Sequence, residues 1–127
     1  MQYNYTKKLD LSFTEAMEKI KVELGKEGFG VLTEIDVKAT LKNKLDKDFD
    51  NYIIYGVCNP SLAYEALLVQ KDIGLFMPCN IIVYEDSGEN FVSAMMPTVA
   101  LQAVSNPAVN EIARTAEEKL KRVINNI

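Results

Sequence analysis

Two periodicities of hydrophobic and polar residues at the start of the chain predict a strand followed by a helix. Residues 2–7 alternate, so that Tyr3 and Tyr5 fall on one face, which predicts a strand. Ser12 and Glu15 then have the spacing of a capping box, in which each side chain satisfies a free amide of the first helical turn. The helix expected there has an apolar stripe at Phe13, Ala16, Met17, Ile20 and Leu24.

The next stretch combines a strand with a short, weakly amphipathic helix. Gly25 and Gly28 can end the first helix in a left-handed conformation, and residues 29–35 are typical of a strand. Asp36 is placed to cap a short helix over residues 37–45. Its apolar stripe is narrow and flanked by lysines, so we expect it at the edge of the sheet with the lysine ends in water.

Residues 52–58, Tyr-Ile-Ile-Tyr-Gly-Val-Cys, are almost continuously apolar and rich in β-branched and aromatic types. Such a run is typical of a strand buried on both faces, so we predict a central strand. Asn59 and Pro60 follow as the N-cap and first residue of a helix, where the missing N–H of proline costs nothing. We expect this helix to run to about Lys71.

Two further strands and a long helix complete the pattern. Residues 79–85 and 90–95 are typical of strands, and Asp86-Ser87-Gly88 between them predicts a tight hairpin. Asn106 and Pro107 repeat the N-cap and proline arrangement. The helix that begins there should be the main cover on one sheet face, because its long apolar stripe comprises Val109, Ile112, Ala113, Ala116, Leu120, Val123, Ile124 and Ile127.

The order of elements predicts the fold class. Strands and helices alternate too irregularly for a doubly wound sheet, and the last two strands form a hairpin. We therefore predict an α+β fold, a two-layer α/β sandwich with a mostly antiparallel five-stranded sheet, two main helices and two shorter inserted helices. With 127 residues, of which 48% are hydrophobic, the chain has the size and the core of a single domain over residues 1–127.

The charge balance disfavours several classes of partner. A formal net charge of −4, from 14 basic and 18 acidic residues, weakly repels polyanions, so we expect no nucleic-acid partner. No apolar run approaches the roughly 18 residues of a membrane span, and the N-terminus shows no apolar signal core. These features predict a cytoplasmic protein with no membrane association.

The rare residue types narrow the chemistry. Histidine is absent, which excludes a Ser-His-Asp or Cys-His relay, a histidine zinc site and an imidazole pH switch. The two cysteines, Cys58 and Cys79, form neither a CxxC pair nor a four-ligand zinc site, and we expect them as reduced thiols. No catalytic residue, metal site or cofactor is therefore predicted.

Three blocks of residues resemble a known family. They are GFGV from Gly28 with TEIDVKATL from Thr33, GVCNP from Gly56, and GLFMPCN from Gly74. With the helices between them they cover nearly the whole chain, and they resemble the bacterial and archaeal domain catalogued as domain of unknown function 302. The resemblance implies a β-α-β₄-α domain similar in plan to the TATA-binding-protein-like folds, commonly a dimer, with no established activity. The likeness to a DNA-binding fold implies no DNA binding, because function depends on the site and this chain is acidic.

The two cysteines mark the candidate site. Cys58 precedes a helix N-terminus, whose free N–H groups and dipole favour a thiolate, and Cys79 begins the next strand. If the two strands are antiparallel, as the family resemblance implies, both thiols lie at one end of the sheet; a parallel crossover would place them at opposite ends. In the first case a ligand pocket would be formed by Cys58, Asn59, Pro60, Cys79 and Asn80.

Three interpretations of the thiol pair stay open. The cysteines can be small buried hydrophobes, with the asparagines capping backbone groups. The helix N-terminus and the asparagines can instead form a pocket for a small anion or polar ligand. In the third interpretation the thiols act through disulfide, persulfide or nucleophilic chemistry, or bind a cuprous ion together with Met77, Met95 or Met96.

These interpretations lead to three functional hypotheses. The leading one is a non-enzymatic homodimeric domain that binds or senses a small molecule or anion at this site. The alternatives are a thiol-dependent redox or sulfur-handling enzyme and a structural or assembly domain without a ligand. The separation and the exposure of the two sulfur atoms discriminate among them.

Overall fold

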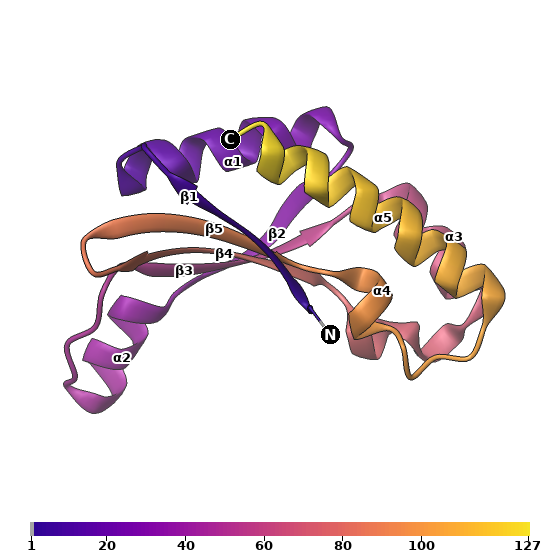
Figure 1. The fold of residues 1–127 in the computed structure, drawn as a ribbon. Coiled ribbons are helices and arrows are strands. Elements are labelled where there is room, and N and C mark those ends of the chain that lie inside the picture. The colour runs from indigo at the N-terminus through magenta and orange to yellow at the C-terminus, as the bar shows by residue number, and fades with distance from the viewer. Residues whose placement is uncertain (1) are drawn as a thin grey trace.

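Five antiparallel strands form one sheet, and the two long helices cover one of its faces (Figure 1). The computed structural model describes residues 2–127. The strands are β1 (Asn4–Leu9), β2 (Gly30–Asp36), β3 (Tyr52–Cys58), β4 (Cys79–Asp86) and β5 (Glu89–Met95), in the order β1-β5-β4-β3-β2. The long helices are α1 (Phe13–Lys26) and α5 (Pro107–Asn125). The predicted two-layer α+β sandwich is confirmed, and each of the four strand pairings is antiparallel.

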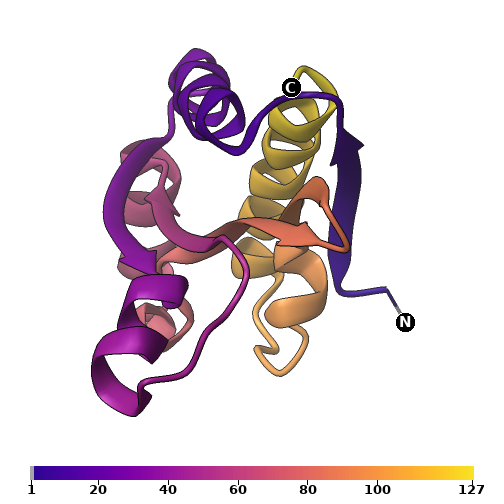
Figure 2. The same ribbon diagram turned by 90° about the vertical axis from the view of Figure 1, so that its left-hand side faces the viewer.

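The shorter helices lie at the two ends of the sheet. Helix α2 (Val37–Leu45) continues from the end of β2 and lies on the side of the sheet away from α1 and α5 (Figures 1 and 2). At the other end lie α3 (Pro60–Val69), the 3₁₀ helix η1 (Lys71–Phe76) and the single-turn helix α4 (Pro97–Ala100). Across residues 2–127, no helix combines the length and the apolar character that crossing a lipid bilayer requires.

The helix predicted to run to about Lys71 is in fact two elements. Its α-helical part, α3, ends at Val69, because Gln70 adopts an extended backbone with φ −151° and ψ 96°. The chain then resumes as η1. No glycine or proline marks this break, so the sequence carries no local signal for it.

The core lies between the sheet and the two long helices. Each fully buried aliphatic side chain there contributes about 1.5–3 kcal/mol relative to its exposed state. The sheet contributes the fully buried Tyr55. The other fully buried core residues, from the helices and the strands, include Ile20, Leu24, Val57, Ile81, Val83, Val92, Leu120, Val123 and Ile124. A second, smaller cluster links α3 and η1 to the first half of α5 through Ala66, Ile73 and Val109.

Strand β3 is an interior strand, but the middle of the sheet is β4. The apolar run of β3 predicted that both of its faces would be covered, but helices α1 and α5 cover only one of them. Tyr52 and Ile54 face away from α1 and α5 and stay half-buried. On that face Tyr52 stacks on Tyr84 at 5.7 Å between ring centroids, and Tyr84 stacks on Phe91 at 5.3 Å. Lateral contacts between aromatic rings, rather than a second helical layer, therefore shield the outer side of β3.

Both ends of α1 are formed by local hydrogen bonds. The predicted capping box is present, with Ser12 Oγ accepting from the Glu15 N–H at 3.1 Å and Glu15 Oε1 accepting from the Ser12 N–H at 3.0 Å. At the other end the Phe29 N–H donates to the Leu24 carbonyl at 3.0 Å. Gly28 makes this bond possible with a left-handed φ of +82°. The chain thereby turns from helix into β2 over the three residues 27–29.

We expect Gly28→Ala to lower the free energy of unfolding by about 1–2 kcal/mol, because a side chain disfavours the left-handed conformation. The added Cβ would also lie 3.1 Å from Asn59 Nδ2. The matched control is Gly25→Ala, inside α1, where a Cβ would meet nothing within 4 Å. That change should raise stability by about 0.5–1 kcal/mol. Urea denaturation followed by circular dichroism measures both, and two changes of the same sign would contradict this account of the turn.

Candidate functional site

Cys58 and Cys79 lie at the same end of two neighbouring antiparallel strands. Strand β3 ends at Cys58 and β4 begins at Cys79, and the register pairs Val57 with Cys79. The chain between them returns to the end it left, as an antiparallel connection must. Of the two geometries that the sequence left open, the antiparallel one is therefore found. The two cysteines are close neighbours across the strand pair.

A cavity of about 310 Å³ lies between this end of the sheet and the adjacent helices. The end of the sheet contributes Val57, Cys58 and Cys79. One wall is formed by α3 and η1, through Leu62, Ala63, Ala66, Leu67, Ile73 and Phe76. The opposite wall is formed by α4 and α5, through Pro97, Leu101, Ile112, Ala113 and Ala116. Apart from one amide, that of Asn59, and the two thiols, the lining side chains are hydrocarbon or thioether.

Alanines on the two facing helices create the space. Ala63 and Ala66 lie one turn apart on α3, and Ala113 and Ala116 have the same spacing on α5. Residues three apart share a helix face, so each pair turns two short side chains toward the cavity. Larger residues would fill the gap, because protein interiors otherwise pack to high density. This repeated Ala-x-x-Ala spacing did not predict a cavity from the sequence, because the same spacing is equally typical of closely packed helices.

The predicted site residues are divided between the two faces of the sheet. Asn59 lines the cavity, but its amide is engaged: Oδ1 accepts from the Leu62 N–H at 3.3 Å and Nδ2 donates to the Glu27 carbonyl at 3.2 Å. Pro60 begins α3 and is not among the lining residues. Asn80 lies in an open hollow of about 450 Å³ on the uncovered sheet face. Successive strand residues point to opposite faces, so Asn80 is separated from Cys79 by the sheet itself.

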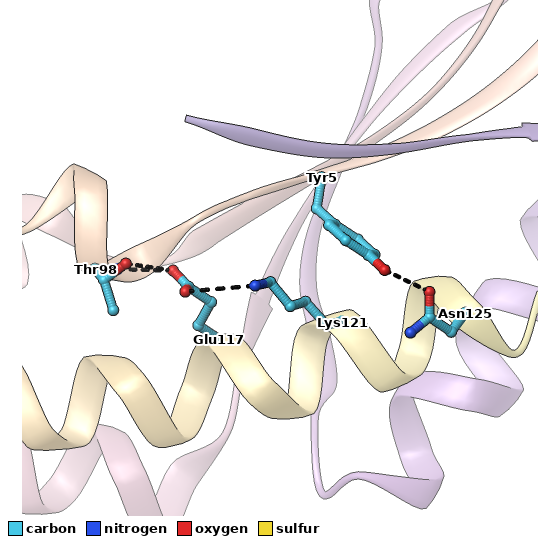
Figure 3. Close-up of polar contacts among 5 residues, drawn as sticks. All are labelled: Tyr5, Thr98, Glu117, Lys121 and Asn125. Atoms are coloured by element: carbon cyan, nitrogen blue, oxygen red, sulfur yellow. Dashed lines mark hydrogen bonds and ion pairs between the residues drawn. The ribbon is translucent and has the colours of Figure 1, made fainter. Parts of the chain in front are cut away.

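Glu117 of α5 positions the α4 wall of the cavity (Figure 3). Its Oε1 accepts a hydrogen bond of 2.6 Å from Thr98 Oγ1 and another of 3.1 Å from the Thr98 N–H. The carboxylate is largely buried, with 13% of the side chain exposed, and Lys121 Nζ lies 3.9 Å from its other oxygen. These bonds anchor the turn that carries Pro97 and Leu101 into the lining. The contact joins residues 19 apart in sequence, and no local pattern indicates it.

The same helix is tied to the sheet one and two turns further on, through Lys121 and Asn125. The Tyr5 hydroxyl donates to Asn125 Oδ1 at 2.7 Å, as Figure 3 shows, and Lys121 Nζ lies 5.5 Å from the centroid of the Tyr5 ring. Helix α5 is thus held beyond the cavity-lining residues by contacts with α4 and with β1.

The electrostatics of the site favour neutral groups. Burial raises the pKa of the Cys79 thiol to about 11, and the neighbouring Cys58 adds to the shift. At neutral pH Cys79 is therefore protonated, and a thiol is a far weaker nucleophile than a thiolate. Both cysteines are free. Within residues 2–127, no three histidine, cysteine, aspartate or glutamate side chains lie close enough to hold a metal ion together.

This geometry defines an antiparallel α+β sandwich whose helices enclose an apolar cavity beside two free thiols. The profile of the family described as "Domain of unknown function DUF302" matches residues 5–127, and the chain belongs to this family. Among solved structures, it is similar to an uncharacterized conserved DUF302 protein from Bacillus stearothermophilus. The two are 31% identical over 99% of this chain and 98% of the other, with a TM-score of 0.93. No curated protein matches the chain. The family resemblance seen in the sequence is confirmed.

In the Cys58→Ser variant, we expect Cys79 to react with iodoacetamide at pH 8 roughly 10- to 100-fold more slowly in the folded protein than in urea. A raised pKa keeps the proton on sulfur. Because the pKa of Cys79 rises from 9.0 to about 11, the thiolate fraction at pH 8 should fall about 100-fold. Burial, the larger cause, persists without Cys58. The folded-state rate should increase only as pH rises toward 11. Equal rates in the folded protein and in urea would contradict the assignment. The Cys79→Ser variant is the control, because Cys58 is then the thiol that reacts.

Proposed function

We propose that this protein binds a small apolar molecule in the cavity between α3, η1, α4 and α5. The observation that carries the proposal is the lining itself, which is almost wholly apolar and surrounds about 310 Å³. Ligand sites commonly measure about 300–1,000 Å³ and are mostly apolar. We favour an apolar ligand over the anion expected from the sequence, because no basic side chain lines the cavity and its one amide is already engaged.

The hydration of such a cavity supports the same conclusion. A water molecule is stable inside a protein only where it finds about two to four polar partners. Carbon-lined walls supply few of these, so water there is poorly satisfied and easily displaced. An apolar ligand gains about 25 cal/mol for each Å² of apolar surface removed from water. A thiol-dependent enzyme that uses Cys79 as its nucleophile has weaker support, because burial raises the pKa of this thiol and keeps it protonated.

We expect a neutral fluorescent probe such as N-phenyl-1-naphthylamine to bind the wild-type protein saturably, with one probe per chain. Ala63→Phe places a large ring in the cavity and should weaken probe binding at least about tenfold. Glu65→Phe adds the same ring to an exposed position of the same helix that does not line the cavity, and it should leave affinity unchanged. Equal binding by both variants, or no saturable binding by the wild type, would count against the cavity as the site.

The uncovered sheet face supports a second proposal, that two copies of the chain associate there. Its central strand positions carry no charge; those with large side chains are Tyr52, Ile54, Ile82, Tyr84, Phe91 and Met95. Charges of both signs lie at the rim, where Lys8 pairs with Glu89 at 2.8 Å. An apolar centre with a polar rim is the usual anatomy of an interface. A rim of both signs suits a twofold dimer, in which one patch must complement itself.

We expect the 14.3 kDa chain to sediment at twice this mass, and Ile82→Glu to convert the dimer into a monomer. In a twofold interface the added carboxylate would be desolvated close to the same carboxylate of the second copy, and the two negative charges would repel each other. Val22→Glu, an exposed position of α1 in the other layer, should leave the dimer intact. Sedimentation equilibrium gives the masses and circular dichroism checks the fold. A wild-type monomer at micromolar concentration would contradict the proposal.

A further inference from the structure

Three of the hydrophobic side chains that line the apolar cavity are also exposed to solvent. Leu32, Leu67 and Phe76 all line the cavity, yet they are 65%, 40% and 39% exposed. Leu67 and Phe76 belong to the wall formed by α3 and η1, and Leu32 belongs to the edge strand β2. We call these three side chains the lip of the cavity. An apolar lip is unusual, because the mouth of a ligand site normally carries polar groups that would meet the outer part of the ligand.

Exposed hydrophobic surface continues outward from the lip. Tyr64, Leu68 and Val69 of α3 are 65%, 67% and 47% exposed, and Leu75 of η1 is 84% exposed. A surface helix usually has a polar outer face, whereas α3 is apolar nearly all round, with Glu65 as its one charged residue. Single exposed leucines need no explanation, but a contiguous apolar patch beside a cavity indicates a binding surface.

The interior offers nothing to recognise a polar group. No charged side chain lines the cavity, and the single amide there is bonded to the Leu62 N–H and the Glu27 carbonyl. A polar group brought inside would lose its hydrogen bonds to water without replacing them, which is unfavourable. Any polar part of a ligand must therefore stay outside, beyond the apolar lip.

We infer that the ligand is a single-chain amphiphile whose hydrocarbon tail enters between Leu32, Leu67 and Phe76 and whose head group remains in solvent. The inference rests on the proposed function and specifies its ligand class. A tail longer than the cavity keeps burying surface as it crosses the lip, which gives the exposed leucines of α3 and η1 a role. Chain length, and not the charge of the head group, then determines affinity, because none of the lining residues is charged.

The test measures the displacement of N-phenyl-1-naphthylamine by hexanol, octanol, decanol and dodecanol, and by the carboxylic acids of equal length, each below its solubility limit. Affinity should rise about three- to fourfold for each added methylene, the equivalent of about 0.8 kcal/mol. Each carboxylate should bind within about threefold of its matched alcohol. A carboxylate preference of tenfold or more would overturn the inference, since it would require a basic head-group site.

Two substitutions test the lip directly. Leu67→Ser and Phe76→Ser should weaken dodecanol at least about fivefold while changing hexanol, which fits inside, less than twofold. Val22→Ser, on α1 and 57% exposed, is the matched control and should change neither. The folded state of each variant is checked by circular dichroism, so that loss of binding is not loss of structure.

The outcomes separate this inference from the proposed function. If affinity stops rising at hexanol, or if the lip variants weaken hexanol and dodecanol equally, the ligand is compact and the inference fails while the cavity remains a site. If neither the probe nor any alcohol binds, the proposed function itself fails. If chain length has no effect but the protein co-sediments with phosphatidylcholine vesicles, the exposed patch is a membrane-docking surface and the inference is overturned.

Discussion

The antiparallel pairing of β3 with β4 is the constraint on which the rest of this structure depends. It returns the chain to the end of the sheet that it left, so that α3 and η1 lie across that end and the two cysteines become neighbours. Gly56 permits the close packing on which this register relies, because a Cβ there would meet Thr33 Oγ1 and would lie 2.8 Å from Pro78 Cγ. With a parallel connection, the thiols would be at opposite ends of the sheet, and β3 and β4 would not both contribute residues to the cavity.

The two faces of the sheet have different physical roles. On one face α1 and α5 bury the aliphatic core, and the cavity lies where this cover passes from α5 to the shorter α3 and η1. The gap arises because short alanine side chains on α3 and α5 leave space beside the cluster of Ala66, Ile73 and Val109 that joins these elements, while Glu117 and Tyr5 anchor α5. On the other face, stacked aromatic rings form a broad surface that no helix covers fully. A small ligand suits the first site, and a flat partner surface suits the second.

Local signals in the sequence located most elements correctly. The capping box at Ser12, the Asn-Pro starts of α3 and α5 and the Ser87-Gly88 hairpin all appear where they were predicted, because each is a hydrogen-bond or backbone preference of adjacent residues. The break at Gln70 was missed because no helix-breaking residue marks it; Asn106, distant in sequence, donates from Nδ2 to the Val69 carbonyl and to Gln70 Oε1 there. The uncovered side of β3 was missed because a continuous apolar run predicts burial on both faces, whereas here Tyr52 and Ile54 are only half-buried and their face is shielded partly by stacked aromatic rings.

For the candidate site, the sequence by itself determined which chemistry is absent and which residues start the helices beside it. Alternation along the predicted strand 79–85 already implied that Cys79 and Asn80 face opposite sides of the sheet, although the predicted site grouped them. The sequence could not determine that Glu117 reaches α4, or that four alanines from two distant helices line one space. Only the tertiary structure decided these points. Caps and turns depend on residues a few positions apart, whereas a cavity is the space left between side chains that the chain brings together from far apart.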